Sequence, residues 1–245
     1  MNRTNLAVEE ENEDYYINYE EFTANSKKKA SKGKSKILKI TYLFIKRIID
    51  IIGAIIGIIF LIPVTIIIYI AKKIIKEDEG PLFYEQLRYG KNGKVFKLYK
   101  YRSMCINAEK KLKEYLEENE EARKEFDEYQ KLKDDPRITK IGKFLRKTSL
   151  DELPQMINIL KGELSFVGPR PVVEKEIERY KENKERFLSV KPGLTGYWQV
   201  NGRSNTNYKE RMNMELYYVD NCSLWLDIKI FFKTFIAVFK KEGAI

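Results

Sequence analysis

The sequence predicts an α+β protein that is predominantly helical, with a small β element, held at a membrane by a re-entrant (monotopic) helix plus interfacial amphipathic helices. Residues 51–71 form an uncharged apolar run, residues 79–104 alternate apolar and basic residues around a glycine-containing turn, and apolar residues recur at near-helical spacing farther on. We expect a disordered acidic-then-basic tail over 1–36, a membrane-associated helix over 37–76, broken near Pro63, and a cytoplasmic domain over 77–245.

The predicted tail is dominated by charge. The charged residues of 1–26 are mainly acids and those of 27–39 are lysines, in a chain with a net charge of +10. Such a segment cannot bury a core, and its basic part is attracted to anionic lipid. Binding of nucleic acid is the alternative explanation for the lysines, and the apolar segment that follows disfavours it.

The composition restricts the chemistry that is available. The chain contains no histidine, which excludes imidazole bases, Ser-His-Asp triads and histidine-ligated metals. Cys105 and Cys222 lack the spacing of metal ligands, so we expect two free cytosolic thiols. Any reaction must therefore use carboxylates, amines or hydroxyls.

The apolar segment from Ile51 to Ala71 carries no charge and would be about 31 Å long as a helix, close to the hydrocarbon thickness of a bilayer. Lysine and arginine flank it on both sides, which favours the cytoplasmic face for both ends. Pro63 would break or kink the helix, and Gly53 and Gly57 would allow close packing. A single-pass helix that tolerates the proline is the alternative.

The remaining elements follow in order. Residues 79–104 predict a basic, half-buried β-hairpin around Gly90–Gly93, and residues 109–133 predict one amphipathic helix. Loops with glycine, proline and arginine are expected to alternate with short apolar helices from residue 134 to 227. The C-terminal LWLDIKIFFKTFIAVFKK predicts a helix that is buried on one side or lies at the bilayer interface.

The segment FLRKTSLDELPQ contains the first candidate site, with Arg146, Asp151 and Glu152 beside helix-start signals. Ser149 and Glu152 have the spacing of a capping box, so the acids could serve stability alone. The free N–H groups of a helix start also stabilise an ionised carboxylate and receive phosphate. An ionised aspartate such as Asp151 is a plausible nucleophile there. Because Asp151 and Glu152 point about 100° apart on a helix, one of the two could attack while the other holds a cation.

Two further segments carry candidate binding residues. Arg170 lies between Pro169 and Pro171 in a stiff loop that suits phosphate or nucleotide recognition, and a structural turn is the alternative. KPGLTGYWQVNGRS places Lys191 before three glycines that leave room for a ligand, with aromatic residues that could instead be membrane anchors.

Three long segments together resemble one known family: DPRITKIGKFLRKTSLDELPQMINILKGELSFVGPRP, KPGLTGYWQVNGR and YYVDNCSLWLDIKI. They are similar in order and spacing to the small monotopic bacterial sugar transferases, the polyprenyl-phosphate phosphoglycosyl transferases. The resemblance covers roughly Leu43 to Lys241. It implies a helix that enters and leaves on the cytoplasmic face of the bacterial cell membrane, turns at Pro63, and precedes a catalytic domain over 77–245.

The resemblance also implies a reaction. Asp151 attacks the sugar-linked phosphorus of a UDP-sugar and releases UMP, and polyprenyl (undecaprenyl) phosphate then takes the phosphosugar in the first membrane step of surface glycan synthesis. The implied cofactor is Mg²⁺, held by Glu152 and Asp227. The implied substrate-binding residues are Arg146, Arg170, Lys191 and, with less support, Arg102.

Three positions depart from the family pattern: Ile62 replaces a frequent serine, Lys191 a usual arginine, and Glu215 a common aspartate. The expected partners are the UDP-sugar, the polyprenyl phosphate, membrane lipid and other glycan-assembly enzymes, with no nucleic acid. The sequence leaves open the sugar, the glycan pathway, the oligomeric state and the role of residues 1–36. A non-catalytic membrane scaffold or anionic-lipid adaptor of the same fold is the alternative function.

Overall fold

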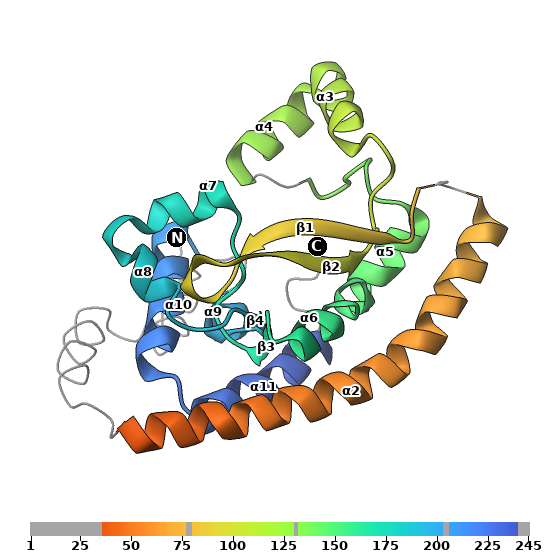
Figure 1. The fold of residues 1–245 in the computed structure, drawn as a ribbon. Coiled ribbons are helices and arrows are strands. Elements are labelled where there is room, and N and C mark those ends of the chain that lie inside the picture. Colours follow the sequence, from red (N-terminus) through yellow and green to blue (C-terminus); the bar gives the residue numbers. More distant parts are fainter. Residues whose placement is uncertain (1–35, 77–79, 130–131, 203–205, 240–245) are drawn as a thin grey trace, which may run out of the picture. The chain divides into compact units, whose positions relative to one another are not determined.

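The computed structural model describes residues 36–76, 80–129, 132–202 and 206–239. Residues up to Phe44 fall in one compact unit and Ile45–Ile245 in the other. The predicted tail over 1–36 lies outside the described residues except for its last position. In the described part of the second unit, helices surround two small sheets, β1-β2 and β3-β4 (Figure 1). The prediction of a mostly helical protein with a small β element is confirmed.

The long helix α2 runs from Lys36 to Ile75 and contains Pro63 in its interior. Its buried positions include Ala54, Leu61 and Ile68, seven residues apart, and most other apolar side chains of the helix are exposed. In the part of the chain that the structure describes, α2 is the one helix that is long and apolar enough to cross a membrane. Only 17% of its most apolar stretch is buried. The break at Pro63 and the re-entrant path stay predictions.

Two glycines of α2 lie directly against the rest of the second unit. A Cβ added to Gly53 would lie 2.5 Å from the ring of Phe166, and a Cβ on Gly57 would lie 2.6 Å from the side chain of Met156. Asp50 is buried and accepts a hydrogen bond from the backbone N–H of Phe166 at 3.0 Å. The predicted close packing at the two glycines is confirmed.

The predicted hairpin is also confirmed. Strands β1 (Phe83–Tyr89) and β2 (Val95–Tyr101) pair antiparallel, and the short 3₁₀ turn η2 (Lys91–Gly93) joins them. Asn92 and Gly93 have φ angles of 58° and 75°, a conformation that asparagine and glycine tolerate best. Leu98 on β2 is buried in a core cluster with residues of α2 and α6, which fixes the hairpin to the helical part.

The expected single helix over 109–133 is wrong, because the segment forms two helices, α3 (Ala108–Glu118) and α4 (Glu120–Tyr129). Asn119 separates them in an extended conformation, and its side-chain oxygen accepts a hydrogen bond from the N–H of Ala122 at 2.9 Å. Asparagine competes with helical hydrogen bonding in this way and so favours a helix start over a helix interior.

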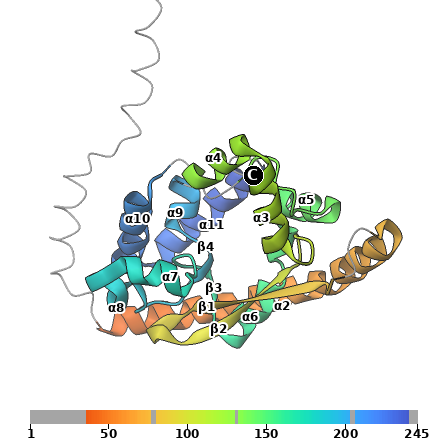
Figure 2. The same cartoon turned by 90° about the horizontal axis from the view of Figure 1, so that it is seen from above.

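Short elements then alternate with loops, as expected. They are α5 (Lys140–Lys147), η3 (Leu150–Glu152), α6 (Gln155–Lys161), β3 (Ser165–Val167), α7 (Glu174–Ile177), η4 (Glu178–Asn183), α8 (Lys184–Phe187), β4 (Gly193–Thr195), α9 (Tyr197–Asn201), α10 (Tyr208–Asn221) and α11 (Leu224–Phe239). Figure 2 shows that β3 and β4 lie between α6 on one side and the helices α9, α10 and α11 on the other.

The parallel pairing of β3 with β4 was not predicted, and it explains two glycine positions. A Cβ on Gly193 would lie 2.0 Å from the nitrogen of Gly168, so the two backbones touch only because both residues lack side chains. The N–H of Gly193 donates to the carbonyl of Pro169, and the N–H of Gly168 donates to the carbonyl of Thr195, both at 2.9 Å. Gly168 and Gly193 therefore leave room for each other's backbone, and the expected approach of a ligand to the glycines after Lys191 stays a prediction.

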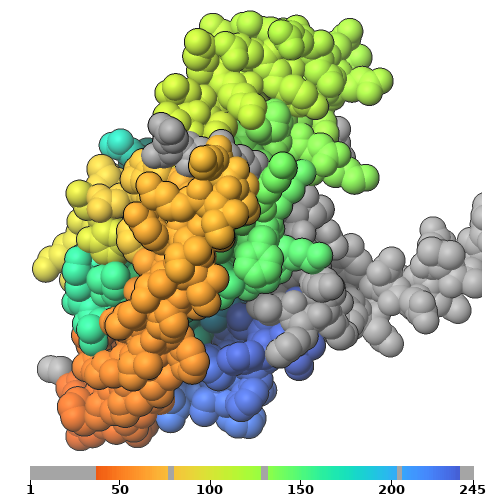
Figure 3. All heavy atoms as spheres, turned by 90° about the vertical axis from the view of Figure 1, so that its right-hand side faces the viewer, coloured from red at the N-terminus to blue at the C-terminus, as the bar shows by residue number. Residues whose placement is uncertain are grey.

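Helix α11 has one buried and one exposed side. Ile230 and Asp227 are buried, whereas Trp225 and Phe232 are 66% and 63% exposed. A 2.6 Å ion pair joins Asp227 to Lys46 of α2, and Figure 3 shows α2 and the blue C-terminal helix on one face of the molecule. The predicted burial of one side is confirmed.

Candidate active site

The carboxylates Asp151 and Glu152 lie on the 3₁₀ turn η3, and α6 begins only at Gln155. Ser149 precedes the turn with a φ of 56° and makes no side-chain capping hydrogen bond. The capping-box interpretation is therefore wrong, because the backbone at Ser149 is left-handed. The two acids do not complete the cap of an α-helix, and other contacts must account for them.

Glu152 is held by a lysine of the hairpin. Lys100 Nζ lies 2.7 Å from Glu152 Oε1, and the two side chains are 21% and 28% exposed. Burial alone would raise the pKa of Glu152, but the positive charges of Lys100 and Arg170 hold that pKa below its ordinary value. Glu152 therefore stays ionised at lower pH than a free glutamate.

Asp151 differs from its neighbour. Burial, with the adjacent charge of Glu152, raises the pKa of Asp151, and the charges of Lys100 and Arg146 oppose that rise. Within the described part of the chain, no other side chain donates a hydrogen bond to the Asp151 carboxylate. Arg146 is held by a 2.9 Å hydrogen bond from its Nε to Ser103 Oγ. The two adjacent acids thus have pKa values shifted in opposite directions, which is typical of functional carboxylates.

A small pocket of about 10 Å³, room for about one water molecule, lies beside Glu152 and is partly open to solvent. Three cationic side chains line it: Arg88 from β1, Lys100 from β2 and Arg170 from the loop after β3. Burial, together with the charge of Arg170, lowers the pKa of the Arg88 guanidinium. Clustered cations around one carboxylate suit a ligand that carries several negative charges.

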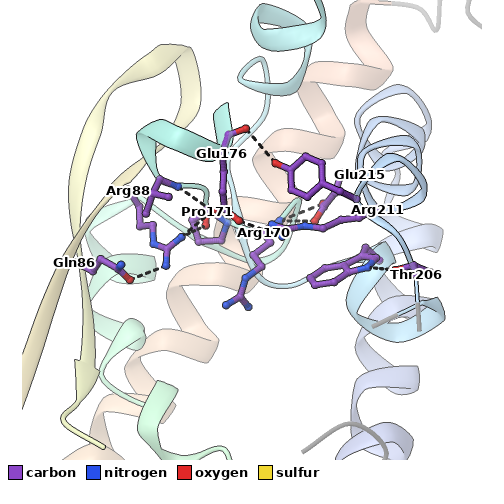
Figure 4. A network of polar contacts seen from close by, with 11 residues as sticks. Gln86, Arg88, Arg170, Pro171, Glu176, Thr206, Arg211 and Glu215 are labelled. Atoms are coloured by element: carbon purple, nitrogen blue, oxygen red, sulfur yellow. Dashed lines mark hydrogen bonds and ion pairs between the residues drawn. The ribbon is translucent and has the colours of Figure 1, made fainter. Parts of the chain in front are cut away.

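The backbone of the Arg170 loop is held by Glu215 and by Arg88, which in turn contacts Glu176 (Figure 4). Both carboxylate oxygens of Glu215 accept from the N–H of Arg170 at 3.2 Å. Arg88 donates to the carbonyl of Pro171 at 3.1 Å and contacts Glu176 at 3.3 Å. In Figure 4 the guanidinium of Arg170 points away from these contacts. The loop therefore presents one arginine from a fixed backbone.

Two of the predicted substrate-binding residues lie elsewhere. Arg102 donates from Nε to the carbonyl of Pro81 at 3.0 Å and lies over the ring of Tyr84. Lys191 lies beside Arg47 of α2, and burial and the Arg47 charge lower its pKa. In the described ranges, neither Arg102 nor Lys191 contacts the carboxylate pair, and their substrate contacts stay predictions.

Asp227, the second predicted magnesium ligand, has other partners in the structure. Its carboxylate oxygens contact Lys46 Nζ and the hydroxyl of Tyr218, each at 2.6 Å. Among the described residues, no three acidic, cysteine or histidine side chains gather as a metal site. Mg²⁺ commonly binds through one or two carboxylates and completes its shell with substrate phosphates and water. Glu152 fits such a site, and the magnesium contact of Asp227 stays a prediction.

Sequence reasoning missed Lys100 and Arg88. Both lie on the hairpin, and the sequence alone does not distinguish them from the other basic residues that alternate along its strands. The alternation does carry a signal, because Leu98 and Lys100 are two apart on β2 and share a face, and Leu98 is buried. That face is turned toward η3 and α6, which the sequence alone did not place.

Comparisons with known proteins identify the family of the chain. The bacterial sugar transferase family model matches residues 41–241. The chain is 48% identical over 86% of its length to an uncharacterized sugar transferase of Haemophilus influenzae, covering 44% of that protein. It is 46% identical over 86% of its length to the undecaprenyl-phosphate galactose phosphotransferase of Salmonella typhimurium, again covering 44%.

Shorter relatives match over most of their length. The exopolysaccharide production protein ExoY of Sinorhizobium fredii is 44% identical over 81% of this chain and 87% of the relative. The chain spans less than half the length of the first two relatives. The family match nevertheless extends from helix α2 to the end of α11 and includes every residue of the pocket. The chain belongs to the bacterial sugar transferase family.

Proposed function

We propose that the protein transfers a sugar 1-phosphate from a UDP-sugar to a polyprenyl phosphate at the cytoplasmic face of the membrane. The observation that carries the proposal is the cluster of Lys100, Arg88 and Arg170 in the pocket beside Glu152, which adjoins Asp151 in the same turn. The names of relatives support the substrate classes, since one is an undecaprenyl-phosphate galactose phosphotransferase and another a UDP-glucose:undecaprenyl-phosphate glucose-1-phosphate transferase.

The proposed reaction has two displacements at phosphorus. In the first, a carboxylate oxygen of Asp151 bonds to the sugar-bearing phosphorus, the bond to the bridging oxygen breaks, and UMP leaves with the electron pair. In the second, a phosphate oxygen of the polyprenyl phosphate bonds to the same phosphorus and the Asp151 carboxylate leaves. The product is a polyprenyl diphosphosugar, and the enzyme is restored.

The contacts favour Asp151 over Glu152 as the nucleophile. Glu152 is engaged by Lys100 at 2.7 Å, which lowers the nucleophilicity of its bonded oxygen, whereas Asp151 has no such side-chain partner among the described residues. Arg146 and Lys100 oppose the rise in the pKa of Asp151 and so favour its ionised form. Lys100 and Arg146, which act on Asp151, would offset the repulsion between this carboxylate and an approaching diphosphate, and Arg88 and Arg170 would add positive charge in the adjoining pocket.

We also propose that Glu152 holds Mg²⁺ together with the donor's phosphates. When bound, the ion would neutralise charge on the diphosphate and stabilise the leaving group. The low pKa of Glu152 supports this role, because only the ionised carboxylate binds the metal.

The exposed apolar surfaces support membrane attachment. The apolar side chains of α2 are exposed along the helix, for example Ile56 at 50% and Phe60 at 62%. On α11, Trp225 and Phe232 are exposed beside lysines, which is typical of a helix at the bilayer interface. We propose that α2 turns at Pro63, so that both of its ends lie on the cytoplasmic face of the membrane. The basic residues on both flanks of the apolar segment favour this arrangement. The polyprenyl phosphate would then reach the pocket from the same face.

The test is UMP release from a panel of UDP-sugars with undecaprenyl phosphate and Mg²⁺, using the full chain in nanodiscs. We expect release with at least one sugar, and a loss of at least about 10³-fold in Asp151→Asn, as for other removed nucleophiles. Asp127→Asn, which changes an exposed aspartate of α4, is the control and should retain wild-type rates. Wild-type rates in Asp151→Asn would contradict the mechanism, and folded protein inactive on the whole panel would contradict the proposed function.

A further inference from the structure

The Pro169-Arg170-Pro171 segment has a single backbone donor. Proline has no N–H, so only Arg170 can donate a backbone hydrogen bond from these three residues. That N–H points at the carboxylate of Glu215 on α10, with 3.2 Å to each oxygen. Glu215 is 0% exposed. Burying a carboxylate is unfavourable, so this acceptor is retained at a cost in stability.

The remaining contacts fix the two ends of the same loop. On one side Gly168 donates to the carbonyl of Thr195 at 2.9 Å. On the other, Arg88 donates to the carbonyl of Pro171 at 3.1 Å. Glu215 therefore holds the middle of the loop, where the arginine itself is attached.

We propose that Glu215 is a positioning residue, which holds the backbone of Arg170 so that the guanidinium faces the diphosphate of the donor. This inference rests on the proposed function. Figure 4 shows the Glu215 carboxylate at the backbone of Arg170 and the guanidinium directed away from it. The acid therefore fixes the arginine without neutralising its charged end, which lines the pocket with Glu152.

The surroundings of Glu215 make the contact sensitive to protonation. Burial raises the pKa of Glu215 to about 7, although the Arg170 N–H and the charge of Arg211 oppose the rise. Arg211 is itself held by Glu176 at 3.2 Å and stacks on Trp198 at 4.5 Å. The charged and titratable groups that act on or respond to Glu215 are Arg170, Arg211, Glu176, Tyr180 and Tyr208. Because its pKa is raised to about 7, Glu215 can gain or lose a proton near neutral pH.

Glu215→Gln in the full chain is the first test. The amide keeps the size and one acceptor oxygen but loses the charge, so the hydrogen bond to Arg170 weakens. We expect the KM for the UDP-sugar to rise about tenfold, with kcat changed by less than about threefold. Glu182→Gln changes an exposed glutamate of η4 and is the matched control, with unchanged KM. Equal KM values for both variants would overturn the proposal.

A second substitution separates positioning from general packing. If Glu215 acts through Arg170, then Glu215→Gln should change KM by less than about twofold in an Arg170→Ala background. A full tenfold effect in that background would show that Glu215 acts by another route. The pH dependence adds a further readout: wild-type KM should fall between pH 6 and 8, as Glu215 ionises, and the glutamine variant should lose this change.

A measurement on the wild-type protein covers the case in which the variants fail to fold. Amide hydrogen exchange, resolved at Arg170 in the nanodisc-bound full chain, should show strong protection of this N–H. Exchange at the unprotected rate would overturn the proposal. Exchange needs no turnover, so a protected Arg170 in a protein that releases no UMP would count against the proposed function and leave the contact of Glu215 with Arg170 intact.

Discussion

Replacing Lys100 with methionine tests the pocket most sharply. The change removes the cation 2.7 Å from Glu152 and keeps a side chain of similar length on β2. Without Lys100, burial would raise the pKa of Glu152, because Lys100 is the largest influence that lowers it. Lys100 also opposes the rise in the pKa of Asp151. Both carboxylates should therefore take up protons at higher pH in the variant.

The size of the effect follows from the geometry. At 2.7 Å the attraction between two unit charges is about 6 kcal/mol at an effective dielectric constant of about 20. Desolvation offsets most of this, and a hydrogen bond to a charged group contributes a net of about 1.5–3 kcal/mol. The side chains are 21% and 28% exposed, so we take the lower half of that range. This corresponds to a loss in kcat/KM of roughly 10- to 40-fold.

The assay is the pH dependence of UMP release under saturating Mg²⁺. The acid limb of the kcat/KM profile should move to higher pH in Lys100→Met and the plateau should fall. Lys97→Met is the control, since Lys97 lies on the same strand, is 60% exposed and pairs with Glu85 away from the pocket. If Lys97→Met and Lys100→Met have the same profile, the assignment of Lys100 to the site is refuted.

Three further predictions concern stability and the metal. Gly193→Ala should lower the melting temperature by several degrees, because the added Cβ would lie 2.0 Å from the nitrogen of Gly168; Gly93→Asn, in open space at a φ of 75°, should leave it almost unchanged. The carboxylate of Glu215 binds a proton more tightly in the folded protein than in the unfolded chain, because its pKa is raised from 4.5 to about 7. The free energy of unfolding should therefore fall by up to about 3 kcal/mol as the pH rises from 4.5 to about 7. Denaturation experiments on Glu215→Gln should no longer show this fall. Asp227→Asn should raise the Mg²⁺ concentration for half-maximal rate several-fold, as the predicted metal contact requires; a lower melting temperature with an unchanged Mg²⁺ requirement would show instead that the contacts of Asp227 with Lys46 and Tyr218 are only structural.

Local patterns in the sequence predicted local structure well. The hairpin followed from its turn residues, and the packing at Gly53 and Gly57 followed from their small size within an apolar helix. Such features depend on residues that are close in the sequence, where periodicity and turn chemistry act directly.

Features that depend on distant segments were missed. Strands β3 and β4 have three residues each, too few for a periodic pattern, and their pairing depends on the meeting of Gly168 and Gly193. The pairing of Lys100 with Glu152 joins two segments whose relative placement is set by the core. The capping-box prediction failed because Ser149 adopts a left-handed conformation, which its spacing from Glu152 does not reveal.

The most direct test of the account is whether Asp151 becomes covalently modified. Wild-type protein in nanodiscs, incubated with an accepted UDP-sugar labelled in the sugar and with Mg²⁺ but without polyprenyl phosphate, is analysed by intact mass and by peptide mapping. We predict a burst of UMP that matches a phosphosugar adduct on Asp151, absent from Asp151→Asn and released when polyprenyl phosphate is added. UMP release that requires the polyprenyl phosphate, with no adduct under quenching conditions that preserve acyl phosphates, would contradict the two-step mechanism.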